Sequence, residues 1–324
     1  MQAVILAAGK STRTYPLTIT KPKPLLKIAN KTLLEHNLDN LSGIADEVII
    51  VVGYKKDLIK NHIGNKYKNL KIRYVEQKKQ LGTAHAVSLV KSYIKDRFIL
   101  LMGDDIYSRS DIKNCIKHSY SILTTRVKNP KNFGVIIETK GILAGFVEKP
   151  KKHISDLVST AFYALDKRIF TYIKKIKKSE RNEFELPDAV RLLAKEQKVY
   201  CVKSSKWLPI GYPKDLLSAD RILRKNKTII GKNSKIYGKI ENSSVGNNCI
   251  VKGSVKNSII MEYAVIGKNS VVNGSIVGEN TRLSGKIYGS IIADNVKAEN
   301  VYIKNCKIWP NKIISNKTIN QDFV

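Results

Sequence analysis

Apolar runs alternate with segments of helical spacing over the first 225 residues of the chain. Short continuous apolar runs, which predict buried strands, occupy residues 1–8, 48–52 and 98–102. Helical spacing is found over residues 33–41, 55–63, 83–93, 167–176, 187–196 and 213–224, and a hairpin is expected around Lys140-Gly141. Strands that alternate with helices predict an α/β fold, in which a mostly parallel sheet carries helices on both faces.

The pattern changes after residue 228. A motif of an aliphatic residue, Gly or Ala, a polar residue and Asn starts at residues 230, 245, 266, 277 and 292, and an apolar residue follows each start six positions later. This period, with Gly and Asn at corners, is typical of a parallel β-helix of hexapeptide turns. Residues 229–305 are enough for roughly five coils, and we expect Ile308-Trp309-Pro310 and the polar end to cap the last one.

The charge of the chain is strongly positive, but the distribution of its basic residues is not typical of a protein that binds nucleic acid specifically. The net charge is +31, and only 11 of the 58 basic residues are Arg. Lys is spread along the whole chain, whereas readers of nucleic acid cluster Arg and aromatic residues on one element. A solvated Lys-rich surface is therefore favoured over specific nucleic-acid binding, and its field would attract anionic substrates of any kind.

Composition also bears on location. The four cysteines are far apart, which disfavours a zinc or redox pair and favours buried thiols in a reducing compartment. The first apolar run is too short for a signal peptide, and none approaches the roughly 18 residues of a membrane span. We expect a soluble, cytoplasmic protein without a membrane partner.

A basic loop follows the first predicted strand directly. It reads Ala7-Ala8-Gly9-Lys10-Ser11-Thr12-Arg13, and Pro16-Leu17-Thr18 and Pro22-Lys23-Pro24-Leu25 come after it. Small residues let the main chain approach an anion closely, while Arg13 and Lys23 add positive charge. The spacing matches neither the dinucleotide fingerprint nor the P-loop, so it predicts a phosphate site of another kind.

Three later segments carry further polar chemistry. Gln77-Lys78-Lys79-Gln80-Leu81-Gly82-Thr83 leads into a predicted helix and, taken alone, predicts a loop with a Gly-Thr helix start. Gly103-Asp104-Asp105 follows a buried strand, where α/β sheets place functional groups. Val147-Glu148-Lys149-Pro150 ends a predicted strand and, taken alone, predicts a surface turn.

In this order, the motifs resemble the signature of the sugar-1-phosphate nucleotidylyltransferases, and the repeats resemble the left-handed β-helix of the hexapeptide-repeat proteins. The resemblance implies a Rossmann-like nucleotidyltransferase domain over residues 1–226 and a short left-handed β-helix with a C-terminal cap over residues 227–324. It also implies the reaction. A sugar-1-phosphate oxygen attacks the α-phosphorus of a nucleoside triphosphate, and pyrophosphate leaves, with Mg²⁺ as cofactor.

The resemblance also implies a role for each matching residue. Arg13 stabilises the triphosphate, Lys23 bridges phosphates, Lys149 positions the attacking phosphate and Asp104 binds Mg²⁺. The implied substrate contacts are Ala8, Gly9, Ser11 and Thr12 for the phosphates, Gln77, Gly82 and Thr83 for the base, and Gly134, Glu148, Ser159 and Thr160 for the sugar. The base segment is most similar to that of uridylyl-transferring members, which favours UTP or dTTP with a hexose or N-acetylhexosamine 1-phosphate; GTP stays open.

Several positions depart from the family pattern. Ser11 replaces a Gly, and Ser159-Thr160-Ala161 stands where the family has a sugar-binding Asn and a Gly. Pro209 takes the place of the family's second metal-binding Asp. Either Asp105 or Asp188 compensates, or metal binding is weak, or the protein is not a catalyst. An enzyme is favoured; the alternative is a catalytically impaired homologue that acts as a nucleotide-sugar-binding regulatory or assembly subunit.

The role of the β-helix follows from its lack of histidine. Some relatives carry an acetyltransferase activity there, for which a general base, usually His, is expected. All five histidines precede residue 229. We therefore expect no acetyl transfer, and we expect the β-helix to serve as the surface through which a homo-oligomer forms.

Overall fold

A computed structural model describes residues 1–324, which form two compact units. The first comprises residues 1–9 and 34–209, and the second comprises residues 10–33 and 210–324. The basic loop after the first strand therefore belongs to the same unit as the C-terminal repeats. None of the helices has the length and apolar character needed to cross a membrane.

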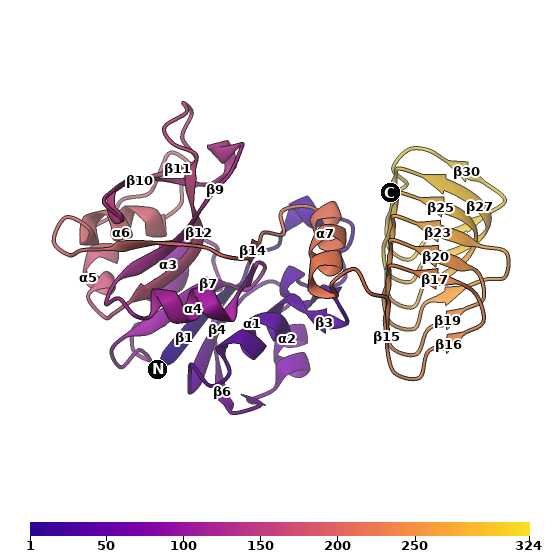
Figure 1. The fold of residues 1–324 in the computed structure, drawn as a ribbon, viewed down its shortest axis with the longest axis horizontal. Coiled ribbons are helices and arrows are strands. Elements are labelled where there is room, and N and C mark those ends of the chain that lie inside the picture. Colours follow the sequence, from indigo (N-terminus) through magenta and orange to yellow (C-terminus); the bar gives the residue numbers. More distant parts are fainter. The chain divides into compact units, whose positions relative to one another are not determined.

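A ten-stranded sheet forms the centre of the first unit (Figure 1). Its parallel part has the order β7-β1-β4-β6. The bounds are β1 (Gln2–Ala7), β4 (Glu47–Val52), β5 (Lys66–Tyr67), β6 (Leu70–Glu76), β7 (Phe98–Met102), β9 (Ser121–Arg126), β10 (Gly134–Thr139), β11 (Ile142–Glu148), β12 (Leu157–Leu165) and β13 (Tyr200–Lys203). Strand β5 and the strands beyond β7 add mainly antiparallel pairs. The α/β class and the hairpin β10–β11 are confirmed.

The helices agree with the predicted spacing, with three main differences. Their bounds are α1 (Leu33–Leu41), α2 (Lys56–Ile63), α3 (Thr83–Ser88), α4 (Arg109–Cys115), α5 (Ile169–Ile173), α6 (Leu186–Leu193) and α7 (Pro213–Leu223), and the 3-10 turns are η1 (Thr12–Thr14), η2 (Lys23–Leu25) and η3 (Pro130–Asn132). Helix α3 ends earlier than predicted, and α5 is shorter at both ends than the predicted range 167–176. Helix α4 was not predicted, because its short sequence has little apolar spacing; Ser108 caps it by accepting the Asp111 N–H at 3.1 Å.

Both faces of the sheet are buried, as the alternation of β1 shows. Val4 and Leu6 belong to a core that includes residues of α3, α5 and α6. Ala3 and Ile5, which point to the opposite face, are equally shielded from solvent. A strand that is apolar at every position is therefore explained by cover on both sides.

The repeats form a parallel β-helix, whose coils are stacked in orange and yellow in Figure 1. One face is the ladder β15 (Ile229–Ile230), β18 (Ser244–Val245), β21 (Ile259–Ile260), β24 (Ile276–Val277), β26 (Ile291–Ile292) and β28 (Lys307–Ile308). The other strands are β16 (Lys235–Ile236), β17 (Ile240–Glu241), β19 (Ile250–Val251), β20 (Ser254–Lys256), β22 (Val265–Ile266), β23 (Val271–Asn273), β25 (Arg282–Tyr288), β27 (Lys297–Lys304), β29 (Ile313–Ser315) and β30 (Thr318–Ile319). Asparagines with positive φ turn the corners, as the repeat predicts.

The C-terminal end continues the repeat further than the motif suggested. Strand β28 pairs with β26, and both β29 and β30 pair with β27. Ile314 and Ile319 are buried in the β-helix core. Residues 307–319 therefore extend the coils beyond residue 305 and do not merely cover them.

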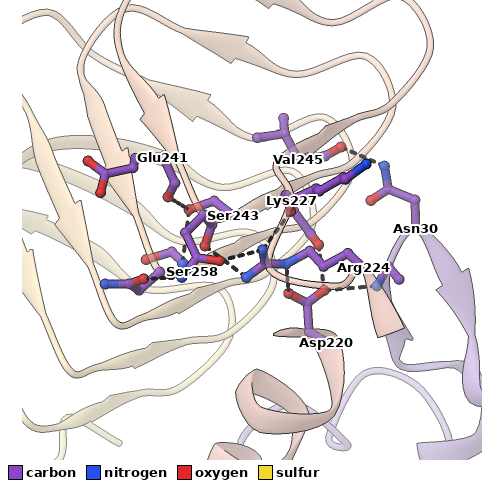
Figure 2. Close-up of polar contacts among 12 residues, drawn as sticks. Asn30, Asp220, Arg224, Lys227, Glu241, Ser243, Val245 and Ser258 are labelled. Carbon is purple, nitrogen blue, oxygen red and sulfur yellow. Dashed lines mark hydrogen bonds and ion pairs between the residues drawn. The ribbon is translucent and has the colours of Figure 1, made fainter. Parts of the chain in front are cut away.

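A buried ion pair at the end of helix α7 connects this helix to the first coils through the further hydrogen bonds of its two side chains (Figure 2). The side chains of Arg224 and Asp220 are 3% and 1% exposed, and Arg224 Nε donates to Asp220 Oδ2 at 2.6 Å. Arg224 Nη2 also donates to the carbonyl of Asn242 at 2.8 Å. Asp220 Oδ1 accepts from the Ala29 N–H at 2.8 Å and from the Ser244 hydroxyl. Both charges are thus hydrogen-bonded, which a buried pair requires.

Candidate active site

Predicted site residues of the first unit gather at the carboxyl ends of its parallel strands. Ala8 follows β1, Gln77 follows β6 and Gly103-Asp104-Asp105 follows β7. Parallel neighbours end at the same edge of a sheet, so these residues share that edge. Gln80 Nε2 donates to the carbonyl of Ala8 at 2.7 Å, which joins the predicted base segment to the start of the phosphate loop.

The loop that carries Asp104 is held by backbone contacts. The Gly103 N–H donates to the carbonyl of Leu6 at 2.9 Å. A Cβ on Gly103 would lie 3.0 Å from Ile5 Cγ2, so a larger residue would displace the loop. Asn37 Nδ2 donates to the carbonyl of Asp105 at 2.7 Å. These contacts hold the backbone of the loop beside β1.

The structure places Pro209 beside Asp105. Strand β14 (Trp207–Leu208) pairs antiparallel with β8 (Ile106–Tyr107), with Leu208 opposite Ile106, so the next residue on each strand faces the other. Trp207 Nε1 donates to Asp105 Oδ2 at 3.1 Å, which occupies that oxygen. No metal ligand comes from Pro209.

Few side chains near Asp104 could bind a metal ion. The structure holds no cluster of three or more His, Cys, Asp or Glu side chains arranged for a metal ion. Asp188, which the sequence suggested as a substitute ligand, contacts Arg191 at 3.4 Å within α6. A carboxylate such as Asp104 still fits a hard cation, because Mg²⁺ is usually held by one or two carboxylates together with substrate phosphates.

Gln77 is held in one orientation by two neighbours. Its Nε2 lies 3.1 Å from His85 Nδ1 and donates to the carbonyl of Gly82 at 3.3 Å. Burial lowers the pKa of His85, which favours the neutral ring whose Nδ1 can accept. With the amide nitrogen engaged, Gln77 presents its carbonyl oxygen as an acceptor. Sequence reasoning missed His85 as the partner, because no motif marks it.

Gly82 and Thr83 contact the segment that leads into α6. Gly82 has φ +108°, and a Cβ there would lie 2.5 Å from the carbonyl oxygen of Phe184. Thr83 Oγ1 accepts from the Leu186 N–H at 3.0 Å. The structure therefore gives both residues a packing role, in addition to the base contact that the resemblance implied.

Glu148 and Gly134 face each other across the hairpin β10–β11. A Cβ on Gly134 would lie 2.8 Å from Glu148 Oε2, so the glycine makes room for the carboxylate. Arg181 Nη2 and Lys149 Nζ lie 3.5 and 3.8 Å from Glu148 Oε1. Burial raises the pKa of Glu148 although the two cations oppose the shift. Arg181 was not predicted, because it lies 33 residues from Glu148.

Ser159 and Thr160 lie at an irregularity of β12. Ser159 Oγ accepts from the Ala161 N–H at 2.9 Å, and Thr160 Oγ1 donates to the carbonyl of Leu123 at 3.1 Å. Tyr107 Oη donates to the carbonyl of Thr160 at 2.7 Å. Ala161 has φ +58°, a left-handed conformation that Gly, the residue of the family pattern at this position, adopts at little cost.

We expect Ala161→Gly to stabilise the first unit. An L-residue in the left-handed region costs about 1–2 kcal/mol, and the entropy of Gly offsets about 0.5–1 of it. The expected gain is about 0.5–1 kcal/mol in the free energy of unfolding, measured by urea denaturation. Ala164→Gly in the same strand is the matched control, because Ala164 has no positive φ; it should destabilise. A loss of stability in Ala161→Gly would contradict the assignment of strain.

The basic loop lies in the second unit and has its own hydrogen bonds. Ser11, which replaces a family Gly, has φ 53° and ψ 54°. Its carbonyl accepts from the hydroxyls of Thr14 and Thr18 at 2.7 and 2.9 Å. The guanidinium carbon of Arg13 lies 5.7 Å from the centre of the Tyr212 ring. Lys23, in η2, is only 4% exposed.

The chain is similar in sequence to known protein families and to named proteins. A family model described as Nucleotidyl transferase matches residues 2–226, and one described as GMPPB C-terminal domain matches residues 219–324. The chain is 35% identical over 347 residues to the bifunctional protein GlmU of Methanocaldococcus jannaschii, covering 98% of this chain and 81% of that protein.

Two further similarities cover the nucleotidyltransferase part. The UTP–glucose-1-phosphate uridylyltransferase AglF of Haloferax volcanii is 33% identical over 240 residues, which are 70% of this chain and 98% of AglF. A solved structure of UDP-glucose pyrophosphorylase with UDP-glucose has a TM-score of 0.62 at 23% identity, covering 70% of this chain and 99% of that one. This last likeness concerns the fold alone.

Proposed function

The chain belongs to the nucleotidyl transferase family, and we propose that it makes an NDP-sugar and pyrophosphate from UTP or dTTP and a hexose or N-acetylhexosamine 1-phosphate. The observation that carries the proposal is the shared strand edge where Ala8, Gln77 and Asp104 follow β1, β6 and β7. The name of AglF, a UTP–glucose-1-phosphate uridylyltransferase, supports a sugar-nucleotide product. We keep residues 1–226 and 227–324 as the two functional domains.

The proposed reaction depends on neutralising and aligning two polyanions. An oxygen of the sugar 1-phosphate attacks the α-phosphorus, and pyrophosphate leaves. Arg13 stabilises the charge that develops on the triphosphate, Lys23 bridges phosphates and Lys149 holds the attacking phosphate. Backbone N–H groups of Ala8, Gly9, Ser11 and Thr12 bind phosphate oxygens. No covalent intermediate is needed, since alignment and electrostatic stabilisation lower the barrier.

Asp104 is the proposed ligand of the divalent metal that family members generally use, and Mg²⁺ is the proposed ion. Because Pro209 supplies no second carboxylate, phosphate oxygens of the substrate would complete the coordination. The ion would neutralise phosphate charge that the side chains leave uncompensated. Asp105 accepts from the Trp207 indole and orients the loop.

The orientation of Gln77 supports the choice of base. With its amide nitrogen engaged by His85 and Gly82, its carbonyl oxygen accepts a hydrogen bond. Uracil and thymine offer an N–H donor at N3, and guanine offers one at N1, whereas cytosine has an acceptor at N3. UTP and dTTP are therefore favoured over CTP.

We expect UTP binding to weaken in acid because of His85. Burial lowers the pKa of His85 below its ordinary value of 6.5, so its ring stays neutral and the Gln77 orientation persists from pH 8 down to that value. Below its pKa, the ring carries a proton on Nδ1 and no longer accepts from the amide. Calorimetric Kd values for UTP between pH 5 and 8 test this; in His85→Ala the acid-specific loss should be absent. An unchanged acid loss in that variant would contradict the assignment.

The sugar contacts are proposed from the hairpin and β12. The Glu148 carboxylate, for which Gly134 makes room, accepts from sugar hydroxyls. Ser159 and Thr160 contact the sugar through the irregular part of β12. Both hydroxyls already contact the backbone. Ser159 Oγ accepts there, which leaves its hydroxyl hydrogen for a sugar oxygen, whereas Thr160 Oγ1 uses its hydrogen for the Leu123 carbonyl.

The β-helix is proposed to hold copies of the chain together and not to transfer acetyl groups. It contains no histidine to act as a general base. The unpaired thiols of all four cysteines suit the reducing cytoplasm, the proposed compartment. The similarity to named transferases favours an enzyme over the regulatory-subunit alternative, for which Pro209 is the main observation.

Release of pyrophosphate tests the proposal. UTP, dTTP, GTP and CTP are each combined with glucose 1-phosphate, N-acetylglucosamine 1-phosphate or mannose 1-phosphate, with and without Mg²⁺. We expect Mg²⁺-dependent release with UTP or dTTP and little with CTP. Release that does not depend on the sugar phosphate would contradict the proposed reaction, and absence of release from every pair would favour the regulatory alternative.

A further inference from the structure

Three acidic side chains occupy one position of the repeat on successive coils of the β-helix. Glu262, Glu279 and Asp294 each lie two residues after strands β21, β24 and β26, which pair in register. We call them the acidic row. They are three of the six acidic residues after residue 228, in a chain with a net charge of +31. Their alignment in so basic a chain calls for a partner.

The upper part of the acidic row holds Thr20 and Lys21. The Lys21 ammonium lies 2.5 Å from Glu279 Oε1 and 3.1 Å from Asp294 Oδ2. The Thr20 hydroxyl donates to Asp294 Oδ2 at 2.5 Å. The side chains of Lys21 and Asp294 are 10% and 6% exposed, so these charges are shielded from solvent. Such pairs are weakened little by salt and fix geometry more firmly than surface pairs.

Glu262, on the coil before that of Glu279, contacts the chain near β2 (Lys27–Ile28). It pairs with Lys27, the first residue of the two-stranded hairpin that β2 forms with β3 (Lys31–Thr32). At the hairpin tip, Asn30 Nδ2 donates to the carbonyl of Val245 in the first coils at 2.8 Å (Figure 2). Residues 20–30 thus contact several successive coils of the β-helix.

The chain between the end of β1 and the start of β2 has little regular structure of its own. It contains only the 3-10 turns η1 and η2. The hydroxyl of Thr18, two residues before Thr20, donates to the carbonyl of Ser11 at 2.9 Å and so links the basic loop to the neighbouring residues that the acidic row contacts. A loop without helix or sheet needs an external support if its side chains are to be placed within about 0.5 Å.

We propose that the acidic row is the positioning device of the phosphate-binding segment, residues 11–27, so that the β-helix takes part in nucleotide binding. The inference rests on the proposed function, which makes the triphosphate the ligand of this segment. The acids neutralise Lys21 and Lys27, and a stack of coils provides a rigid support. Glu262, Glu279 and Asp294 are positioning residues and do not touch the substrate.

The test is the double variant Glu279→Gln/Asp294→Asn in the full chain. Both changes keep the shape of the side chain, replace one acceptor oxygen by an amide nitrogen and remove the charges that hold Lys21. The matched control is Glu241→Gln, which removes the pair of Glu241 with Lys256 at 2.8 Å elsewhere on the same β-helix. Glu279→Gln alone is measured as well, because Glu279 is 31% exposed and its loss spares the coil interior.

Two readouts separate positioning from stability. Hydrogen exchange of the amides of residues 11–27 should become about tenfold faster in the double variant but not in the control. The KM for the nucleoside triphosphate should rise about tenfold, while the KM for the sugar 1-phosphate stays within about twofold.

Unchanged exchange overturns the inference, and so does faster exchange with an unchanged KM for the nucleotide. Equal rises of both KM values with a lower melting temperature indicate a structural role only and also overturn it. If the wild-type chain is inactive with every substrate pair, the proposed function fails; the exchange data and the calorimetric Kd for UTP then decide the inference by themselves.

Discussion

Replacement of Asp104 by Asn is expected to lower kcat for pyrophosphate release by about 10³-fold, because a metal ion contributes several kcal/mol to charge stabilisation and each 1.4 kcal/mol is about tenfold in rate. The effect should be large in this chain because Pro209 provides no second carboxylate. The Mg²⁺ concentration for half-maximal rate should rise as well. Steady-state kinetics with Mg²⁺ varied at saturating substrates measures both.

Asp105→Asn is the matched control for Asp104. The amide oxygen of the substituted side chain can still accept from the Trp207 indole, so the loop should keep its conformation. We expect the kcat of this variant to stay within about tenfold of the wild type, since no metal charge is lost. If the control loses activity and the Asp104 variant keeps it, the metal ligand has been assigned to the wrong carboxylate.

Arg13→Ala should lower kcat by about 10²- to 10³-fold, the usual cost of removing one preorganised donor from developing negative charge. The Arg13 guanidinium lies over the Tyr212 ring and is not in an ion pair with a carboxylate, so its charge remains available to a phosphate. Initial rates at saturating nucleotide and sugar phosphate measure the effect, and the melting temperature should stay unchanged because the side chain is exposed.

Arg13→Lys and Tyr212→Leu qualify this result. Lysine keeps the charge but not the two-pronged geometry, so only part of the activity should return. Tyr212→Leu removes the ring beneath the guanidinium and should cost much less than the loss of Arg13 itself. An Arg13→Ala variant with nearly full activity would remove Arg13 from the proposed mechanism.

Periodicity explains why much of the fold could be predicted. The apolar runs of β1, β4 and β7 and the six-residue repeat after residue 228 are local signals, which depend on neighbours in sequence. Strands β9 and β13 have no such signal: Ser121–Arg126 and Tyr200–Lys203 are short and partly polar, and only pairing with β12 and with each other makes them strands. Of the antiparallel part of the sheet, only the hairpin β10–β11 could therefore be predicted.

The candidate site also contains residues that the sequence predicts and residues that it does not. Motif residues such as Gln77 and Asp104 could be predicted because they follow apolar strands. Their partners could not, since the contact of Arg181 with Glu148 joins segments far apart in sequence. The acidic row had a signal that was overlooked: the third position of the repeat motif changes from Lys232 and Asn247 in early coils to an acid in Glu279 and Asp294.

Transfer of an isotopic label tests the central claim most directly. The sugar 1-phosphate of the active pair is prepared with ¹⁸O in its phosphate oxygens and incubated with the unlabelled nucleoside triphosphate, Mg²⁺ and the full chain. If a sugar-phosphate oxygen attacks the α-phosphorus, ³¹P NMR and mass spectrometry will find the label in the bridge of the NDP-sugar and none in pyrophosphate. Unchanged sugar phosphate beside a hydrolysed nucleotide would contradict the account.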